Sequence, residues 1–194
     1  MSATGEARLF AAVGLPANVS WRLAAWGQQV ADVLGSRSAA AGLRVLERDS
    51  LHLTLSFLGE RPTEEIPGLA EAFREACVGA PELELALGAP LWLPPRSPRA
   101  LAVEVREDSG SLASLQGAVE LALGGERSGR RRFRPHVTVG RTRAGFRAPA
   151  GLELPVTPAV SFAARTADLV RSWLEPQGAR YEVQCSVGLG AAAP

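Results

Sequence analysis

The sequence of 194 residues contains no lysine, because all 21 of the residues counted as Lys or Arg are arginines. Lysine binds nucleotide phosphates in P-loop proteins, forms Schiff bases and carries the nucleotidyl group in many ligases. Its absence therefore excludes P-loop and Schiff-base chemistry. It also excludes an ATP-driven ligase that works through an adenylated lysine.

Cysteines and long apolar runs are scarce as well. The two cysteines, Cys77 and Cys185, stand apart without a CxxC spacing, which argues against a disulfide framework or a cysteine-rich zinc site. Residues 1–8 lack the basic segment and apolar run of a signal peptide, and no stretch approaches 18 uncharged apolar residues. We therefore expect a soluble cytoplasmic protein that makes no use of a membrane.

Charge of one sign is not in excess. The formal net charge is +1, with 46% hydrophobic and 21% charged residues. This balance is typical of a globular chain that can bury a core. RNA or another polyanion would have to meet a local cluster of positive charge.

Only two histidines occur, and each opens a tetrad of the same form, His52-Leu53-Thr54-Leu55 and His136-Val137-Thr138-Val139. Alternation along a strand places His and Thr on one face and the apolar residues on the other. In the first strand the apolar face should also carry Leu51 and Phe57. Because histidine exchanges protons near neutral pH, two such strands could flank a phosphate with an acid, a base and two hydroxyl donors.

The sequence argues against two other uses of these histidines. A metal site needs at least one further ligand, yet neither tetrad contains Asp or Glu, and the chain has no HExxH motif. A Ser-His-Asp nucleophile is also disfavoured, because Ser56 lies outside any glycine-flanked nucleophile elbow. The sequence therefore predicts acid–base chemistry without a metal or another cofactor.

Arginines gather just before the second tetrad and directly after it. Residues 127–134 read RSGRRRFR, and we expect this run to steer RNA to the site through Arg130, Arg131 and Arg132. Arg141 follows Gly140 at the end of the tetrad strand. Strict alternation would turn Arg141 into the core, but a bend at Gly140 would direct its guanidinium to the phosphate.

Aromatic side chains offer platforms for stacking bases, although core packing is the favoured interpretation for each. The candidates are Phe10, Phe57, Phe133 and Trp92.

Hydrophobic periodicity predicts three helices, each with a start or stop signal. The first spans residues 19–33 and ends at Gly35, the second follows a Thr63 cap, and the third follows a Ser109 or Ser111 cap and ends at Gly124. Strands are expected at residues 8–15, 44–46, 51–58 (ended by Gly59), 83–93 and 100–105, at the second tetrad, near residues 160 and 169, and at 181–189.

The second tetrad follows the first by nearly half the chain, and each lies after a predicted helix and a loop. We therefore predict an α+β fold that is a bilobal, pseudo-symmetric duplication. Two mainly antiparallel sheets would line a central cleft with the helices outside, and residues 1–194 would form a single bilobal domain.

Four blocks of sequence also resemble the bacterial RNA 2′,3′-cyclic phosphodiesterases, once called 2′-5′ RNA ligases, of the 2H phosphoesterase superfamily. The blocks are residues 8–16, 50–60, 132–141 and 169–183, and they follow the family's order. The resemblance implies hydrolysis of a terminal 2′,3′-cyclic phosphate on RNA to a 2′-phosphate, with 2′-5′ ligation as the reverse reaction. No metal or nucleotide cofactor is implied.

The resemblance also implies roles for individual residues. His52 would be the proton donor and His136 the proton acceptor, while Thr54, Thr138 and Arg141 would bind the phosphate. RNA with 2′,3′-cyclic phosphate ends, tRNA fragments among them, would be the substrate of a monomeric enzyme. One departure is Val45, since relatives often have tryptophan after the arginine that corresponds to Arg44.

Two alternatives remain open at this point. The chain could be a non-catalytic module that binds nucleotides or RNA, which a turnover assay would decide. It could also be a cyclic phosphodiesterase that acts on a small nucleotide, such as a cyclic ADP-ribose phosphate. Rates on tRNA fragments and on mononucleotides would separate an RNA enzyme from this last class.

Overall fold

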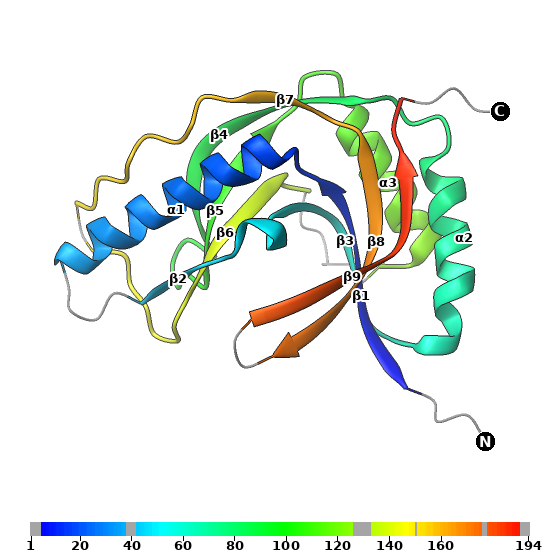
Figure 1. Ribbon diagram of the computed structural model, residues 1–194, viewed down its shortest axis with the longest axis horizontal. Coiled ribbons are helices and arrows are strands. Elements are labelled where there is room, and N and C mark those ends of the chain that lie inside the picture. The colour runs from blue at the N-terminus through cyan, green and yellow to red at the C-terminus, as the bar shows by residue number, and fades with distance from the viewer. Residues whose placement is uncertain (1–4, 38–41, 126–132, 150, 176–177, 191–194) are drawn as a thin grey trace.

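The computed structural model describes residues 5–37, 42–125, 133–149, 151–175 and 178–190 (Figure 1). Helical segments are interspersed with strands along the chain. In chain order the elements are β1 (Glu6–Gly14), α1 (Ala17–Arg37), β2 (Leu43–Val45), the 3-10 turn η1 (Arg48–Ser50), β3 (His52–Pro62), the 3-10 turn η2 (Thr63–Glu65), α2 (Ile66–Cys77), β4 (Leu83–Leu93), β5 (Ala100–Arg106), α3 (Ser111–Leu123), β6 (His136–Thr142), β7 (Ser161–Ala164), β8 (Thr166–Glu175) and β9 (Gly178–Gly188).

All paired strands run antiparallel, in the order β7-β4-β5-β6-β3-β1-β8-β9, and β2 adds to β6. One half of the sheet contains β3, β1, β8 and β9, and the other contains β2 and β4 to β7. The halves meet where Leu53 of β3 pairs with Val137 of β6. The predicted α+β class with two antiparallel halves is confirmed, and this junction joins the halves into one curled sheet.

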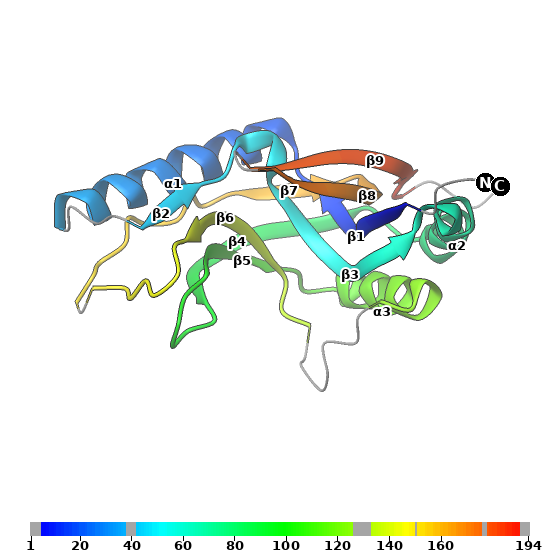
Figure 2. The ribbon, with the colours of Figure 1, turned by 90° about the horizontal axis from the view of Figure 1, so that it is seen from below.

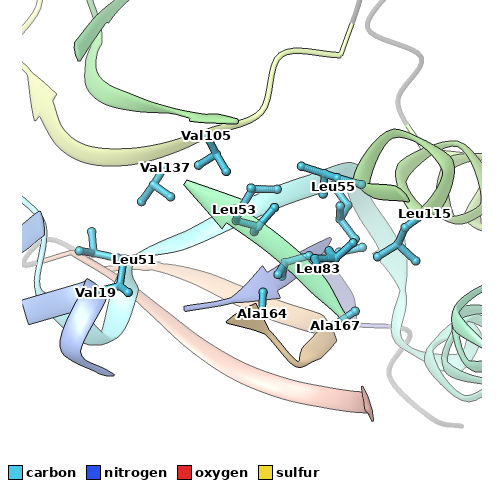
Figure 3. Packing of buried hydrophobic residues seen from close by; sticks show 14 of the residues in the cluster. Val19, Leu51, Leu53, Leu55, Leu83, Val105, Leu115, Val137, Ala164 and Ala167 are labelled. Atoms are coloured by element: carbon cyan, nitrogen blue, oxygen red, sulfur yellow. The ribbon is translucent and has the colours of Figure 1, made fainter. Parts of the chain in front are cut away.

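Helices cover the sheet face that carries the apolar residues of the two tetrads. Leu53 and Val137 are fully buried there, and Leu55 lies beside Leu115 of α3 (Figure 3). Alternation predicted this side of each strand correctly. The opposite face carries the histidines and threonines.

The helices cross between the halves. α1 precedes β3 along the chain but packs against β2 and β6, whereas α3 precedes β6 but packs against β3 and α2 (Figure 2). α2 also contacts β9 and β8. The two lobes are therefore not consecutive halves of the sequence. None of the helices in the described part of the chain is long and apolar enough to cross a membrane.

Helix ends differ from the sequence-based prediction. α1 begins at Ala17 and continues past Gly35 to Arg37. Thr63 caps no helix, because it opens the turn η2 and α2 begins only after Glu65, without a side-chain cap. The Thr63 hydroxyl donates to the carbonyl of Gly5 at 2.9 Å. α3 has no side-chain cap either, since it starts after Gly110, whose φ of 83° only glycine adopts readily. The predicted end of α3 at Gly124 is confirmed.

The β1–β3 pairing contains two register shifts, and they change which side chains of β3 face the core beyond the tetrad. The strand continues through Gly59 instead of ending there. Phe57, predicted on the core face, lies opposite Phe10 and is 51% exposed, whereas Ser56 is buried. Each bulge adds one residue to a strand and so reverses the alternation that follows it.

Gly27 allows α1 to lie close to β6. A Cβ at Gly27 would come within 2.6 Å of Val139 Cγ1, whereas a Cβ at Gly117 of α3 would meet nothing within 4 Å. We expect Gly27→Ala to lower the free energy of unfolding by about 1–2 kcal/mol, because overpacking outweighs the gain in helix propensity. Gly117→Ala is the matched control and should raise it by about 0.5–1 kcal/mol. Urea denaturation measures both, and equal stabilisation by the two substitutions would contradict the close approach.

Candidate active site

The two tetrads lie side by side in the centre of the sheet. Because Leu53 and Val137 are antiparallel partners, His52 lies next to Thr138 and Thr54 next to His136. All four polar side chains are half-buried on the face opposite the core. The result is a local twofold arrangement of two histidines and two hydroxyls around one point.

Each histidine ring is held in the same way. Nδ1 of His52 lies 2.9 Å from the carbonyl oxygen of Ser50, and Nδ1 of His136 lies 2.7 Å from that of Arg134. A carbonyl can only accept, so each Nδ1 carries the proton and donates it. In both rings Nε2 is therefore the nitrogen that can exchange a proton with a ligand.

The surroundings of His52 favour its neutral form. Its ring stacks on Phe10 with centroids 4.7 Å apart, and Tyr181 meets it edge-on at 5.4 Å. Burial is the largest cause that lowers the pKa of His52 from 6.5 to about 4, and the positive charges of Arg141 and His136 lower it further. The hydrogen bond to Ser50 works in the opposite direction. His52 is therefore unprotonated at neutral pH in the free protein.

Arg141 reaches the same face as the histidines. A shift in register between β5 and β6 leaves Val139 and Gly140 both buried, so that Arg141 emerges exposed. Gly140 is needed there, since a Cβ would lie 3.1 Å from the carbonyl oxygen of Arg44. This is the change of direction that the sequence suggested at Gly140.

Two further arginines near the histidines were missed from the sequence. Arg8, Arg44 and Arg141 all lower the pKa of Tyr181, although burial is the larger effect and raises it. Arg44 is the partner of Arg141 in the β2–β6 pair. The only sequence signal for Arg8 is its position in β1, two residues before Phe10. Arg44 stood out in the sequence only for Val45, the residue that follows it.

The other predicted site residues have different outcomes. Arg130, Arg131 and Arg132 lie outside the described residues. Phe133 and Trp92 are partly buried against the core, and Trp92 also contacts Phe146. Within the described ranges, no three His, Cys, Asp or Glu side chains come close enough together to hold a metal ion.

A cavity of about 440 Å³ opens beside His52. Its floor is formed by residues of β1, β8 and β9, and its wall by the start of α1 and by η1. The lining residues are Phe10, Ala12, Val13, Gly14, Leu15, Ala17, Ser20, Trp21, Arg48, Asp49, Leu51, His52, Asp168, Val170, Tyr181 and Val183.

Comparison with known families agrees with this geometry. The family model of the 2′-5′ RNA ligase superfamily matches residues 22–173, a range that includes both tetrads and Arg141. The chain belongs to this superfamily. The resemblance carried by the sequence blocks is thereby confirmed.

Two curated members of the superfamily are similar over most of their length, and both are named RNA 2′,3′-cyclic phosphodiesterase. The protein from Thermus thermophilus is 34% identical over 184 residues, which cover 91% of this chain and 87% of the relative. The protein from Archaeoglobus fulgidus is 30% identical over 139 residues, which cover 70% of this chain and 73% of the relative.

Solved structures of the superfamily share the fold. The crystal structure of TT0787 from Thermus thermophilus has a TM-score of 0.74 at 29% identity and covers 94% of this chain and 97% of its own. Escherichia coli LigT complexed with 3′-AMP has a TM-score of 0.73 at 24% identity, and the match covers 96% of this chain and all of LigT. The LigT likeness concerns the fold.

The lowered pKa of His52 predicts how stability depends on pH. The unfolded chain binds this proton with a pKa of 6.5 and the folded chain with one of about 4, so stability falls as the pH drops from 6.5 towards 4. Between pH 7 and pH 5, the pKa shift of His52 should lower the free energy of unfolding by about 2 kcal/mol. In His52→Gln the loss over this interval, measured by urea denaturation, should be smaller by that amount.

His136→Gln is the matched control for this measurement, because it removes the partner histidine on the same face of the sheet and leaves His52 in place. It should retain the loss of stability on acidification that burial of His52 causes. If the two variants showed the same pH dependence, burial of His52 would not be the source of the effect.

Proposed function

We propose that this protein is an RNA 2′,3′-cyclic phosphodiesterase that opens a terminal cyclic phosphate to a 2′-phosphate. Its substrate would be RNA with a 2′,3′-cyclic phosphate end, and tRNA fragments are one natural source. The names of the two curated relatives support this activity. The observation that carries it is the meeting of the two tetrads at Leu53 and Val137, with each Nδ1 held by a carbonyl.

The reaction requires two proton transfers on opposite sides of phosphorus. Water attacks in line with the P–O3′ bond and gives its proton to Nε2 of His136. As that bond breaks, Nε2–H of His52 donates its proton to the departing 3′ oxygen. The product is a 2′-phosphate with a free 3′-hydroxyl, and solvent then returns the proton from His136 to His52. A 5′-hydroxyl attacking in place of water would form a 2′–5′ linkage.

Three further groups would bind the non-bridging oxygens. The hydroxyls of Thr54 and Thr138 lie beside the two histidines, and Arg141 brings a fork of N–H donors to the same face. Charge on these oxygens grows as water attacks, so donors already in place stabilise the transition state. No metal is needed for this scheme.

The donor role of His52 follows the family resemblance, and its low pKa works against that role. In the free protein the His52 ring is neutral at pH 7, and its Nε2 carries no proton. A phosphate anion between the rings would offset the repulsion from Arg141 and raise this pKa. Substrate binding is therefore the step that protonates His52 in our proposal.

Substitution of each histidine tests these roles. His52→Ala and His136→Ala should each lower kcat/KM on a 2′,3′-cyclic phosphate oligonucleotide about 10²–10⁴-fold, the usual contribution of one proton transfer. A substrate with sulfur in place of the 3′ oxygen needs no proton on its leaving group, since a thiolate is a weak base. His52→Ala should recover most of its rate on that substrate, and His136→Ala should remain slow.

The pattern of rescue distinguishes the outcomes. Rescue of His136→Ala in place of His52→Ala would exchange the donor and the acceptor. Near-parental rates in either variant on the oxygen substrate would refute two-histidine catalysis. Circular dichroism of both variants checks that the fold is retained.

Arg141 should act at the reacting phosphate. We expect Arg141→Gln to lower kcat/KM about 100-fold on mononucleotide and oligonucleotide cyclic phosphates alike, because it stabilises charge that develops on phosphorus. The pKa of His52, followed by NMR, should also rise, since the charge of Arg141 depresses it. The control is Arg74→Gln on α2, where Arg74 pairs with Glu71. A loss confined to oligonucleotides would place Arg141 on the RNA chain instead.

A further inference from the structure

The cavity beside His52 extends from the histidine across β1 to β8 and β9. Small and apolar side chains form its floor, and they include Ala12, Val170 and Val183. Trp21 and Arg48 stand in its wall, with the guanidinium 4.4 Å from the centre of the indole ring. An apolar floor with an indole ring and a guanidinium in the wall fits a planar ring system.

Asp168 is the acidic group at the floor of this cavity. Thr54 and Asp168 are the two partners of Ala12 in neighbouring strands, so their backbones lie two strand spacings apart, about 10 Å. A single nucleoside spans this distance when its phosphate lies between the histidines.

The carboxylate of Asp168 leans toward the histidine. A Cβ at Gly14 would lie 3.5 Å from Asp168 Oδ2, and Gly14 is the β1 partner of His52. Because Gly14 has no side chain, no β1 side chain at this position separates Asp168 Oδ2 from His52. The glycine keeps the cavity open at this point.

Asp168 retains acceptor capacity. The hydroxyl of Ser186 donates to it, and burial raises its pKa. In the described part of the chain it belongs to none of the ion pairs. A carboxylate has about four lone-pair sites, so the Ser186 bond leaves room for further donors.

We propose that this cavity binds the base of the nucleotide that carries the cyclic phosphate, and that Asp168 selects guanine by accepting from its N1–H and N2–H groups. The proposal rests on the proposed function, because it places the phosphate between His52 and His136. Guanine presents two adjacent donors to a carboxylate. Uracil flanks its single N3–H with two carbonyl oxygens, which a carboxylate repels.

The experiment compares the four nucleoside 2′,3′-cyclic monophosphates as substrates. The parent protein should hydrolyse the guanosine compound with a kcat/KM about 10- to 100-fold above that for the uridine compound, the range expected for one paired base edge. Asp168→Asn offers one donor and one acceptor, which match O4 and N3–H of uracil. This variant should lower the ratio about 10-fold or more, mainly by raising KM for the guanosine compound.

The matched control is Asp32→Asn on α1, an exposed carboxylate that does not line the cavity. It removes the same charge and should leave the ratio of guanosine to uridine unchanged. Val183→Trp provides a second route, since a large side chain on the floor should abolish the base preference with Asp168 intact. Base-independent rates in the parent protein, or an unchanged ratio in Asp168→Asn, would overturn the proposal.

Binding separates this proposal from the proposed function. Calorimetry with 2′-GMP and 2′-UMP measures the base preference without turnover. A protein that prefers 2′-GMP but hydrolyses none of the four compounds would keep the subsite and refute the phosphodiesterase. A protein that hydrolyses all four equally would keep the phosphodiesterase and refute the subsite.

Discussion

The backbone pairing of Leu53 with Val137 joins the halves of the sheet at the point where the two tetrads meet. Both side chains are fully buried, so a slip of either strand by one residue would expose them and turn a histidine into the core. Burial of two aliphatic side chains therefore fixes the strand register, and the register sets which polar groups face each other. The geometry of the proposed acid–base pair is a consequence of core packing on the other side of the sheet.

Near-twofold symmetry at this junction does not make the histidines equivalent. Both rings use the same hydrogen bond to the carbonyl two residues earlier. His52 alone is enclosed by Phe10 and Tyr181, and these rings remove it from water. This enclosure lowers the pKa of His52 and works against its proposed donor role, so the two histidines begin the proposed reaction in different surroundings. The aromatic neighbours separate the two sites electrostatically, while the backbone keeps them geometrically alike.

Local sequence pattern predicted much of how the candidate site residues are placed. Alternation gave the shared face of the histidines and threonines and the burial of the residues between them, and the glycine before Arg141 marked a change of direction. Phe57 was misplaced because a bulge depends on how β1 pairs with β3, which no local pattern reveals. Arg8 and Arg44 were missed for a related reason. They approach Tyr181 only through pairings between strands far apart in the sequence.

The exchange of helices between the lobes affects how the molecule can assemble. α1, from the first part of the chain, covers the half built on β4 to β7, and α3, from the middle, covers the half that contains β1 and β3. Cleavage of the chain at any one point would leave at least one piece without the helix that covers its half of the sheet. Contacts between distant segments must form before either layer is closed, which is characteristic of slow and cooperative folding. Both lobes, and with them both histidines, are gained or lost in one event.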